Sequence, residues 1–161
     1  DLEELANTPV MVVCAGAKAI LDLNLTMEYL ETKGIPVYCY RTDELPAFYT
    51  RNSGIRAPFR ADSARELADI WKAKTELGIQ GGFIVANPIP REYSMDPVRI
   101  NGAIDEAISE MNALGIRGKE TTPYLLDKVQ KLTGGELGIR RDEALLPDYR
   151  EHFRDDLIFF M

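Results

Sequence analysis

The chain has 161 residues, a formal net charge of −7 at pH 7 and a hydrophobic content of 45%. This length supports one domain with its own core and is short for two. The negative charge disfavours nucleic acid and anionic membranes as partners, because both select clustered lysine and arginine. No apolar run approaches the roughly 18 residues of a membrane span, so we expect no membrane contact either.

The two cysteines, Cys14 and Cys39, both lie in apolar runs that are typical of strands. They have no CxxC spacing, and no dense cysteine framework surrounds them. We therefore expect reduced, buried thiols and a cytoplasmic location.

The first elements are a strand, a helix and a second strand. Residues 9–15 form a continuous valine-rich run, as in strands of parallel sheets that are covered on both faces. Apolar residues from Ile20 onward then recur at spacings of three and four until Gly34, which predicts a helix. A second strand is predicted over residues 35–40. Such a unit implies a parallel, right-handed crossover.

Residues 41–62 carry no sustained period, and this stretch is longer than a compact domain usually gives to a connection. We therefore expect it to line a site. Three of its four arginines, Arg51, Arg56 and Arg60, could bind an anion such as a phosphate, and a solvated loop explains them equally well.

The next segment repeats the pattern of helix and strand. Ser63 and Glu66 form an S-x-x-E capping box that opens a helix ending before Gly78. The period of this helix predicts one inward face that includes Lys74 and Leu77. A short apolar run over residues 83–86 then predicts a buried strand that ends at Asn87. The chain is therefore of the α/β class with a mostly parallel sheet.

Two further helices are predicted. Asp96 and Pro97 stand at the N-cap and first-turn positions of a long helix that ends near Gly115. Thr122 and Pro123 repeat this start signal for a helix over residues 124–132. Residues 137–161 have dense mixed charge and predict no recognisable element.

Several familiar chemistries lack their motifs in this sequence. His152 is the only histidine, so a Ser-His-Asp or Cys-His arrangement could be built only around that residue, and a site with several histidines cannot be built within this chain. No G-x-G-x-x-G follows a strand and no G-x-x-x-x-G-K-[ST] occurs, which disfavours a generic dinucleotide or P-loop domain.

Lys18 is the strongest candidate for a catalytic residue. It follows a predicted parallel strand at the sheet edge where α/β proteins bind ligands, and the predicted helix start would make its ammonium easier to deprotonate. A neutral amine can attack a carbonyl and form a Schiff base. The alternative is a lysine that extends to solvent from a strand end.

Asn87 is a second candidate, for substrate binding. It follows a strand and begins the stiff sequence Asn-Pro-Ile-Pro, which could present its side chain to a ligand. The alternative is that Asn87 and the prolines only terminate the strand.

Five blocks of sequence together resemble the pseudouridine-5'-phosphate glycosidase family, which is related to the indigoidine A proteins. In order, they are VVCAGAKAILDLNLTMEYLETKGIPV, TDELPAFYTR, GGFIVANPIP, GIRGKETTPYLL and LTGGE. The resemblance covers residues 1–136, as the C-terminal portion of the family's domain, and leaves residues 137–161 as a divergent charged tail.

The resemblance implies a three-layer α/β/α fold, incomplete relative to the family. It also implies a glycosidase or lyase of nucleotide catabolism that reversibly cleaves the carbon–carbon glycosidic bond of pseudouridine 5'-phosphate to uracil and ribose 5-phosphate. The family's nucleophilic lysine falls on Lys18, which would form an imine with the sugar. The resemblance further implies a manganese cofactor and, for the complete protein, a homotrimer.

The resemblance also implies which parts are missing. Asp1 matches the last residue of a substrate-binding segment, so it is a candidate substrate-binding residue. The metal-binding aspartate, the catalytic glutamate and the phosphate-binding residues of the family would precede this chain, and no metal ligand is expected within it. Two interpretations follow: part of an active glycosidase, or a non-catalytic truncated remnant that binds a sugar phosphate or a partner subunit.

Overall fold

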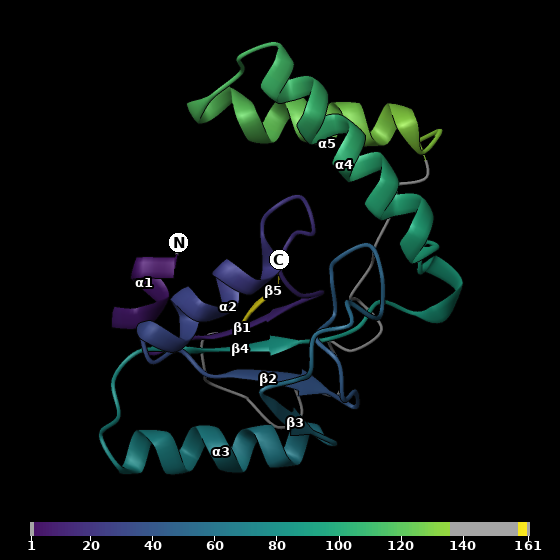
Figure 1. The fold of residues 1–161 in the computed structure, drawn as a ribbon. Helices are drawn as coiled ribbons and strands as arrows, with labels where there is room; N and C mark the ends of the chain where they lie inside the picture. Colours follow the sequence, from purple (N-terminus) through teal and green to yellow (C-terminus); the bar gives the residue numbers. More distant parts are fainter. Residues whose placement is uncertain (1, 136–157, 161) are drawn as a thin grey trace.

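A computed structural model describes residues 2–135 and 158–160 as an α/β fold (Figure 1). The main elements are α1 (Leu2–Asn7), β1 (Met11–Cys14), α2 (Leu23–Thr32), β2 (Val37–Tyr40), β3 (Phe59–Ala61), α3 (Ala64–Glu76), β4 (Phe83–Ala86), α4 (Pro97–Ala113), α5 (Thr121–Leu132) and β5 (Ile158–Phe160). Short 3-10 helices, η1 (Arg91–Tyr93) and η2 (Gly118–Glu120), precede α4 and α5.

The sheet has the strand order β3-β2-β4-β1-β5, and every neighbouring pair is parallel. Strand β4 lies between β1 and β2, so the two strands predicted to form the first crossover are not neighbours. The predicted parallel sheet is confirmed.

Helices cover both faces of the sheet. Alternate residues of each strand point to opposite faces, because the period of a strand is two. On one face, Leu67 and Trp71 of α3 pack with Met11, Val13, Phe83 and Val85. On the other face, Leu5 of α1 and Leu30 of α2 pack with Val37, Cys39 and Ala86. The expected three-layer architecture is present (Figure 1).

The α4–α5 hairpin forms a third core that does not include the sheet. Ile100 and Ile104 of α4 and Leu125 and Val129 of α5 are buried against one another. The same core contains Ile20 and Tyr49, which come from loops that follow β1 and β2. The hairpin therefore packs on loops at one edge of the sheet.

Two strands of the structure were not predicted from the sequence. Strand β3 lies inside the stretch expected to be irregular and has only three residues, which is too short for an alternation to be recognised. Strand β5 lies in the tail for which no element was predicted, and its backbone pairs with β1. Both are edge strands that depend on pairing with a distant neighbour.

Three helix details also differ from the prediction. Helix α2 begins at Leu23, and Asp22 caps it by accepting a hydrogen bond from the backbone N–H of Leu25 at 3.0 Å. Leu77, expected on the buried face of α3, is 74% exposed because it lies at the C-cap. Thr122 lies inside α5 and is not its N-cap.

The predicted capping box at the start of α3 is present in a modified form. Ser63 Oγ accepts a hydrogen bond from the N–H of Glu66 at 3.1 Å, and Glu66 accepts one from the N–H of Asp62 at 2.8 Å. The canonical box would use the N–H of the capping residue itself. The two contacts bind two of the N–H groups at the helix start.

Replacing Ser63 with alanine is expected to lower the free energy of unfolding by about 1 kcal/mol, because the N–H of Glu66 loses its side-chain acceptor. Urea unfolding would measure this change. Ser109→Ala is the matched control, since Ser109 is exposed within α4 and caps nothing. Equal midpoints for the two variants would contradict the prediction.

Candidate active site

The candidate site lies where β1 and β4 end side by side. The N–H of Asn87 donates a hydrogen bond to the carbonyl of Cys14 at 2.8 Å, which extends the pairing one residue beyond the two strands. Residues 15–22 then leave β1, and residues 87–96 leave β4. Lys18 and Asn87 are therefore brought to the same carboxyl edge of the sheet, as the sequence predicted for a ligand site in a parallel fold.

Lys18 is located in the loop after β1 and not in a helix. Its carbonyl accepts a hydrogen bond from the N–H of Leu21 at 2.9 Å, and α2 begins only at Leu23. The argument that a helix start favours deprotonation of Lys18 is therefore wrong. Ile20 was counted in the apolar period of the helix, but it lies before α2 and is buried against the α4–α5 hairpin.

The Lys18 side chain remains available for chemistry. It is partly exposed, and it has no hydrogen bond or ion pair with another side chain in residues 2–135. An ammonium group of a surface lysine needs no fixed partner, so this freedom is compatible with either a nucleophile or a solvated lysine.

Asn87 is buried, with 6% of its surface exposed. Within the described part of the chain, its carboxamide makes no hydrogen bond, although it can offer two N–H donors and one acceptor. An unpaired buried amide costs free energy, roughly 1–3 kcal/mol by mutational measures. Such a group at the ligand-binding edge of a sheet is expected of a residue that pairs with a ligand.

A third loop, residues 41–58, closes against the loop of Lys18. The N–H of Phe48 donates to the carbonyl of Ala15 at 3.0 Å, and Gly16 forms an antiparallel bridge with Ala47. Gly16 has a φ of +95°, and a Cβ atom there would lie 1.9 Å from the carbonyl oxygen of Pro46. Glycine is therefore required for this close approach.

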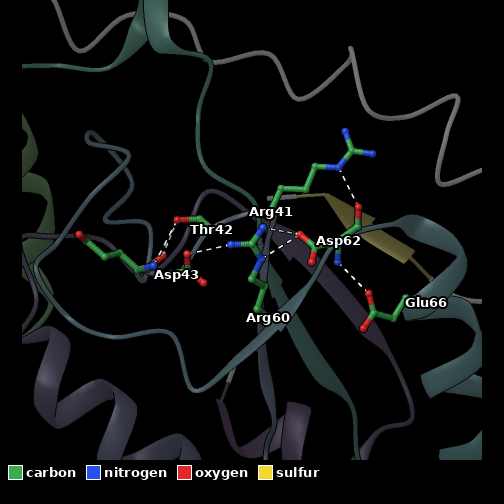
Figure 2. A network of polar contacts seen from close by, with 7 residues as sticks. Arg41, Thr42, Asp43, Arg60, Asp62 and Glu66 are labelled. Carbon is green, nitrogen blue, oxygen red and sulfur yellow. Dashed lines mark hydrogen bonds and ion pairs between the residues drawn. The ribbon is translucent and has the colours of Figure 1, made fainter.

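Arg41, which begins this third loop, and Arg60, which lies in β3, both have partners. Arg60 forms ion pairs with Asp43 at 2.8 Å and with Asp62 at 2.7 Å, and these carboxylates raise its pKa (Figure 2). Arg41 donates to the carbonyl of Asp62 at 2.9 Å. The anion-binding interpretation is weakened for Arg60, because two carboxylates already surround its guanidinium.

Potential metal-binding side chains do not cluster in the described residues. Within residues 2–135, no three histidine, cysteine, aspartate or glutamate side chains converge, and Asp43 and Asp62 are engaged by Arg60. Manganese and its expected ligand outside this chain stay predictions. Asp1 and His152 lie outside the described residues.

Both cysteines are thiols, as predicted. Cys39 is fully buried and Cys14 partly so. They lie on either side of β4, each in register with Ala86, which separates their Cα atoms by two strand spacings, about 10 Å. That is too far for a disulfide. Burial, together with the neighbouring Cys14, raises the pKa of Cys39 to about 12.

A family model described as indigoidine synthase A like protein matches residues 1–145. The chain belongs to this family. The match extends past residue 136, and the predicted domain boundary at that residue stays a prediction.

Proteins named pseudouridine-5'-phosphate glycosidase are similar to this member of the family. The chain is 58% identical over 136 residues to the one from Clostridium botulinum and 54% identical to the one from Escherichia coli. Each match covers 84% of this chain and 44% of the relative. The chain thus spans less than half the length of these relatives.

Two solved structures have the same fold as this family member. The prealnumycin C-glycosynthase AlnA, solved in complex with ribulose 5-phosphate, has a TM-score of 0.79 at 37% identity. The match covers 85% of this chain and 45% of the AlnA chain. An indigoidine synthase A-like protein from Thermotoga maritima has a TM-score of 0.75 at 34% identity and covers 94% of this chain and 49% of its own.

Sequence reasoning found the two loops but missed contacts between them. Arg51 was named only as a possible anion ligand, and Ser94 was not named, yet they contact each other across 43 residues of sequence. The unusual length of the 41–62 stretch was the available signal.

Among the described elements, no helix is long and apolar enough to cross a membrane.

Proposed function

We propose that this chain carries the nucleophilic lysine of a pseudouridine-5'-phosphate glycosidase, with Lys18 as the nucleophile. The observation that carries the proposal is the position of Lys18, in the loop that follows β1 and at the same sheet edge as Asn87, whose buried carboxamide has no hydrogen-bond partner among the described residues. The names of the relatives and the sugar phosphate in the AlnA complex support it.

The proposed reaction uses the amine nitrogen as an electron donor. Lys18 Nζ forms a bond to C1' while the ring bond from C1' to O4' breaks, and O4' takes up a proton as the attached amine loses one. The carbon–carbon bond from C1' to uracil then breaks, the nitrogen lone pair forms the imine, and the uracil carbon takes a proton from an acid. Water hydrolyses the imine to release ribose 5-phosphate and regenerate the amine. A lysine suits this bond because a C-glycoside has no leaving-group oxygen to protonate.

Asn87 is assigned a binding role. Its carboxamide is rigidly placed, since Asn87 is buried and its backbone N–H donates a hydrogen bond to the carbonyl of Cys14. It can pair with a hydroxyl of the sugar as donor and acceptor. A ligand that forms these hydrogen bonds removes the free-energy cost of the unpaired buried amide. The site therefore favours a polar ligand over an apolar one.

Replacing Asn87 with leucine is expected to separate stability from binding. The free energy of unfolding stays equal or rises by about 1 kcal/mol, because an unpaired buried amide is replaced by an apolar group of similar size. The apparent affinity for ribose 5-phosphate falls about tenfold through the lost hydrogen bonds. Thermal unfolding and the trapping assay below measure the two effects. A marked loss of stability would show that Asn87 is structurally paired.

A trapping experiment tests the proposed function. The chain is incubated with ribose 5-phosphate, reduced with borohydride and analysed by peptide mass spectrometry. The expected product is a reduced sugar adduct on Lys18, in excess over Lys72 and Lys131, whose side chains are 74% and 71% exposed and report unspecific glycation. Ribose without the phosphate serves as the substrate control.

The second candidate is a non-catalytic remnant that binds a sugar phosphate or a partner subunit. The chain covers less than half the length of the relatives, and the resemblance places the catalytic acid outside the part that it covers. A folded chain that binds ribose 5-phosphate but yields adducts only at the level of Lys72 and Lys131 would support this candidate over the first.

The proposal also concerns the complete enzyme. We propose that the whole protein acts in the cytoplasm, as its reduced cysteines favour, and that it is a homotrimer with manganese, as the resemblance implies. Sedimentation velocity on a chain of the relatives' length, with and without added manganese, would measure its assembly.

A further inference from the structure

The segment 45–51, which belongs to the third loop, contacts both the loop that carries Lys18 and the loop that carries Asn87. The N–H of Phe48 donates to the carbonyl of Ala15, three residues before Lys18, at 3.0 Å. The carbonyl of the next residue, Tyr49, accepts a hydrogen bond from the N–H of Met95 at 3.0 Å. Two adjacent residues therefore bind the loop that follows β1 and the loop that follows β4.

Arg51 adds two contacts to the second of these loops. Its backbone N–H donates to Ser94 Oγ at 3.3 Å, and its guanidinium donates to the carbonyl of Ile89. Ile89 is 1% exposed and stands two residues after Asn87. The side chain of Arg51 thus holds a buried turn that begins at Asn87.

The charge of Arg51 has no carboxylate partner within residues 2–135, in contrast to Arg60. A hydrogen bond from a charged donor to a carbonyl is stronger than a neutral one. The turn has few backbone hydrogen bonds of its own, because Pro88 and Pro90 lack N–H donors, and the contact with Arg51 is therefore important for holding it.

The segment is also held in a costly backbone conformation. Phe48 has a φ of +63°, which non-glycine residues seldom adopt. It persists where the surroundings hold it, and here Ala47 and Phe48 both donate backbone hydrogen bonds, to Thr50 and Ala15.

We propose that Arg51 is a positioning residue: it fixes the turn at residues 87–90 so that the Asn87 carboxamide faces a sugar phosphate bound at Lys18. This inference rests on the proposed function. Arg51 itself acts through the Ile89 carbonyl and is not assigned a contact with the reacting atoms.

The test compares Arg51→Ala and Arg51→Lys with the control Arg65→Ala, a 74% exposed arginine of α3. Hydrogen exchange followed by mass spectrometry reports on residues 87–96, and the trapping rate is measured against ribose 5-phosphate concentration. For Arg51→Ala we expect exchange in residues 87–96 to rise about tenfold, with β1 and α3 unchanged. The half-saturating concentration should rise about tenfold and the maximal rate change less.

Arg51→Lys should recover part of both effects, since an ammonium can also donate to the Ile89 carbonyl. Unchanged exchange in residues 87–96 of Arg51→Ala overturns the positioning role, even if affinity falls, because Arg51 would then contact the phosphate directly. This readout needs no activity, so it is distinct from failure of the proposed function, which a wild-type chain without adduct would indicate. If Arg51→Ala does not fold, the same comparison is made between Arg51→Met and the wild type, because methionine keeps most of the aliphatic side chain but offers no donor to the Ile89 carbonyl; equal exchange in residues 87–96 then overturns the role.

Discussion

Replacing Lys18 with alanine is expected to abolish the borohydride-trapped sugar adduct while leaving the fold intact. In the described residues the Lys18 side chain makes no hydrogen bond or ion pair with another side chain, so its removal costs the fold little. If the amine forms the imine, no other group can replace it. Turnover of pseudouridine 5'-phosphate by the complete enzyme should then fall on the order of a thousandfold or more. Peptide mass spectrometry and circular dichroism measure the two effects.

Lys18→Arg is the control that separates charge from nucleophilicity. Arginine keeps a positive charge at this position, but its guanidinium stays protonated and does not form the imine. We expect no adduct in this variant, together with retained binding of ribose 5-phosphate. An adduct of wild-type yield in the alanine variant would place the reactive amine elsewhere in the chain.

Replacing Gly16 with alanine is expected to have the largest effect on stability. The new Cβ would lie 1.9 Å from the carbonyl oxygen of Pro46, and the φ of +95° is unfavourable for any residue with a Cβ. Backbone strain and overpacking together should cost roughly 3 kcal/mol or more. Urea unfolding measures this loss. The bridge from Gly16 to Ala47 should open at the same time, which would also lower trapping at Lys18.

Gly34→Ala is the matched control for strain alone. Gly34 has a φ of +68°, but a Cβ there would meet no atom within 4 Å. It should cost about 1 kcal/mol, from the backbone conformation only. Equal losses for the two variants would mean that the loop at Pro46 moves aside without cost.

Local signals predicted most of the helices because a helix start depends on neighbouring residues. Asp96 caps α4 by accepting a hydrogen bond from the N–H of Arg99 at 2.8 Å, and Ser63 caps α3. Lys74 shows the limit of this reasoning. It was placed on the inward face of α3, but its role, donating to the carbonyls of Ile79, Gln80 and Gly81, depends on a turn that the helix period does not describe.

Pairings between distant residues were not predictable in the same way. Strand β3 exists because Phe59 and Ala61 pair with Tyr38 and Tyr40, and no local pattern distinguishes three such residues from a loop. The start of α2 was misjudged because burial of Ile20 by the α4–α5 hairpin has the same sequence signature as a helix face.

By itself, the sequence determined the α/β class, the parallel sheet, and two candidate residues, Lys18 and Asn87, that follow strands. These depend on hydrophobic periods and on the rule that parallel strands present their carboxyl ends to ligands. Only the tertiary structure decided that Lys18 lies in a loop, that the Asn87 side chain is buried with no partner among the described residues, and that Arg51 donates to the carbonyl of Ile89. Burial and long-range hydrogen bonds depend on which surfaces meet in space, and no short stretch of sequence specifies that meeting.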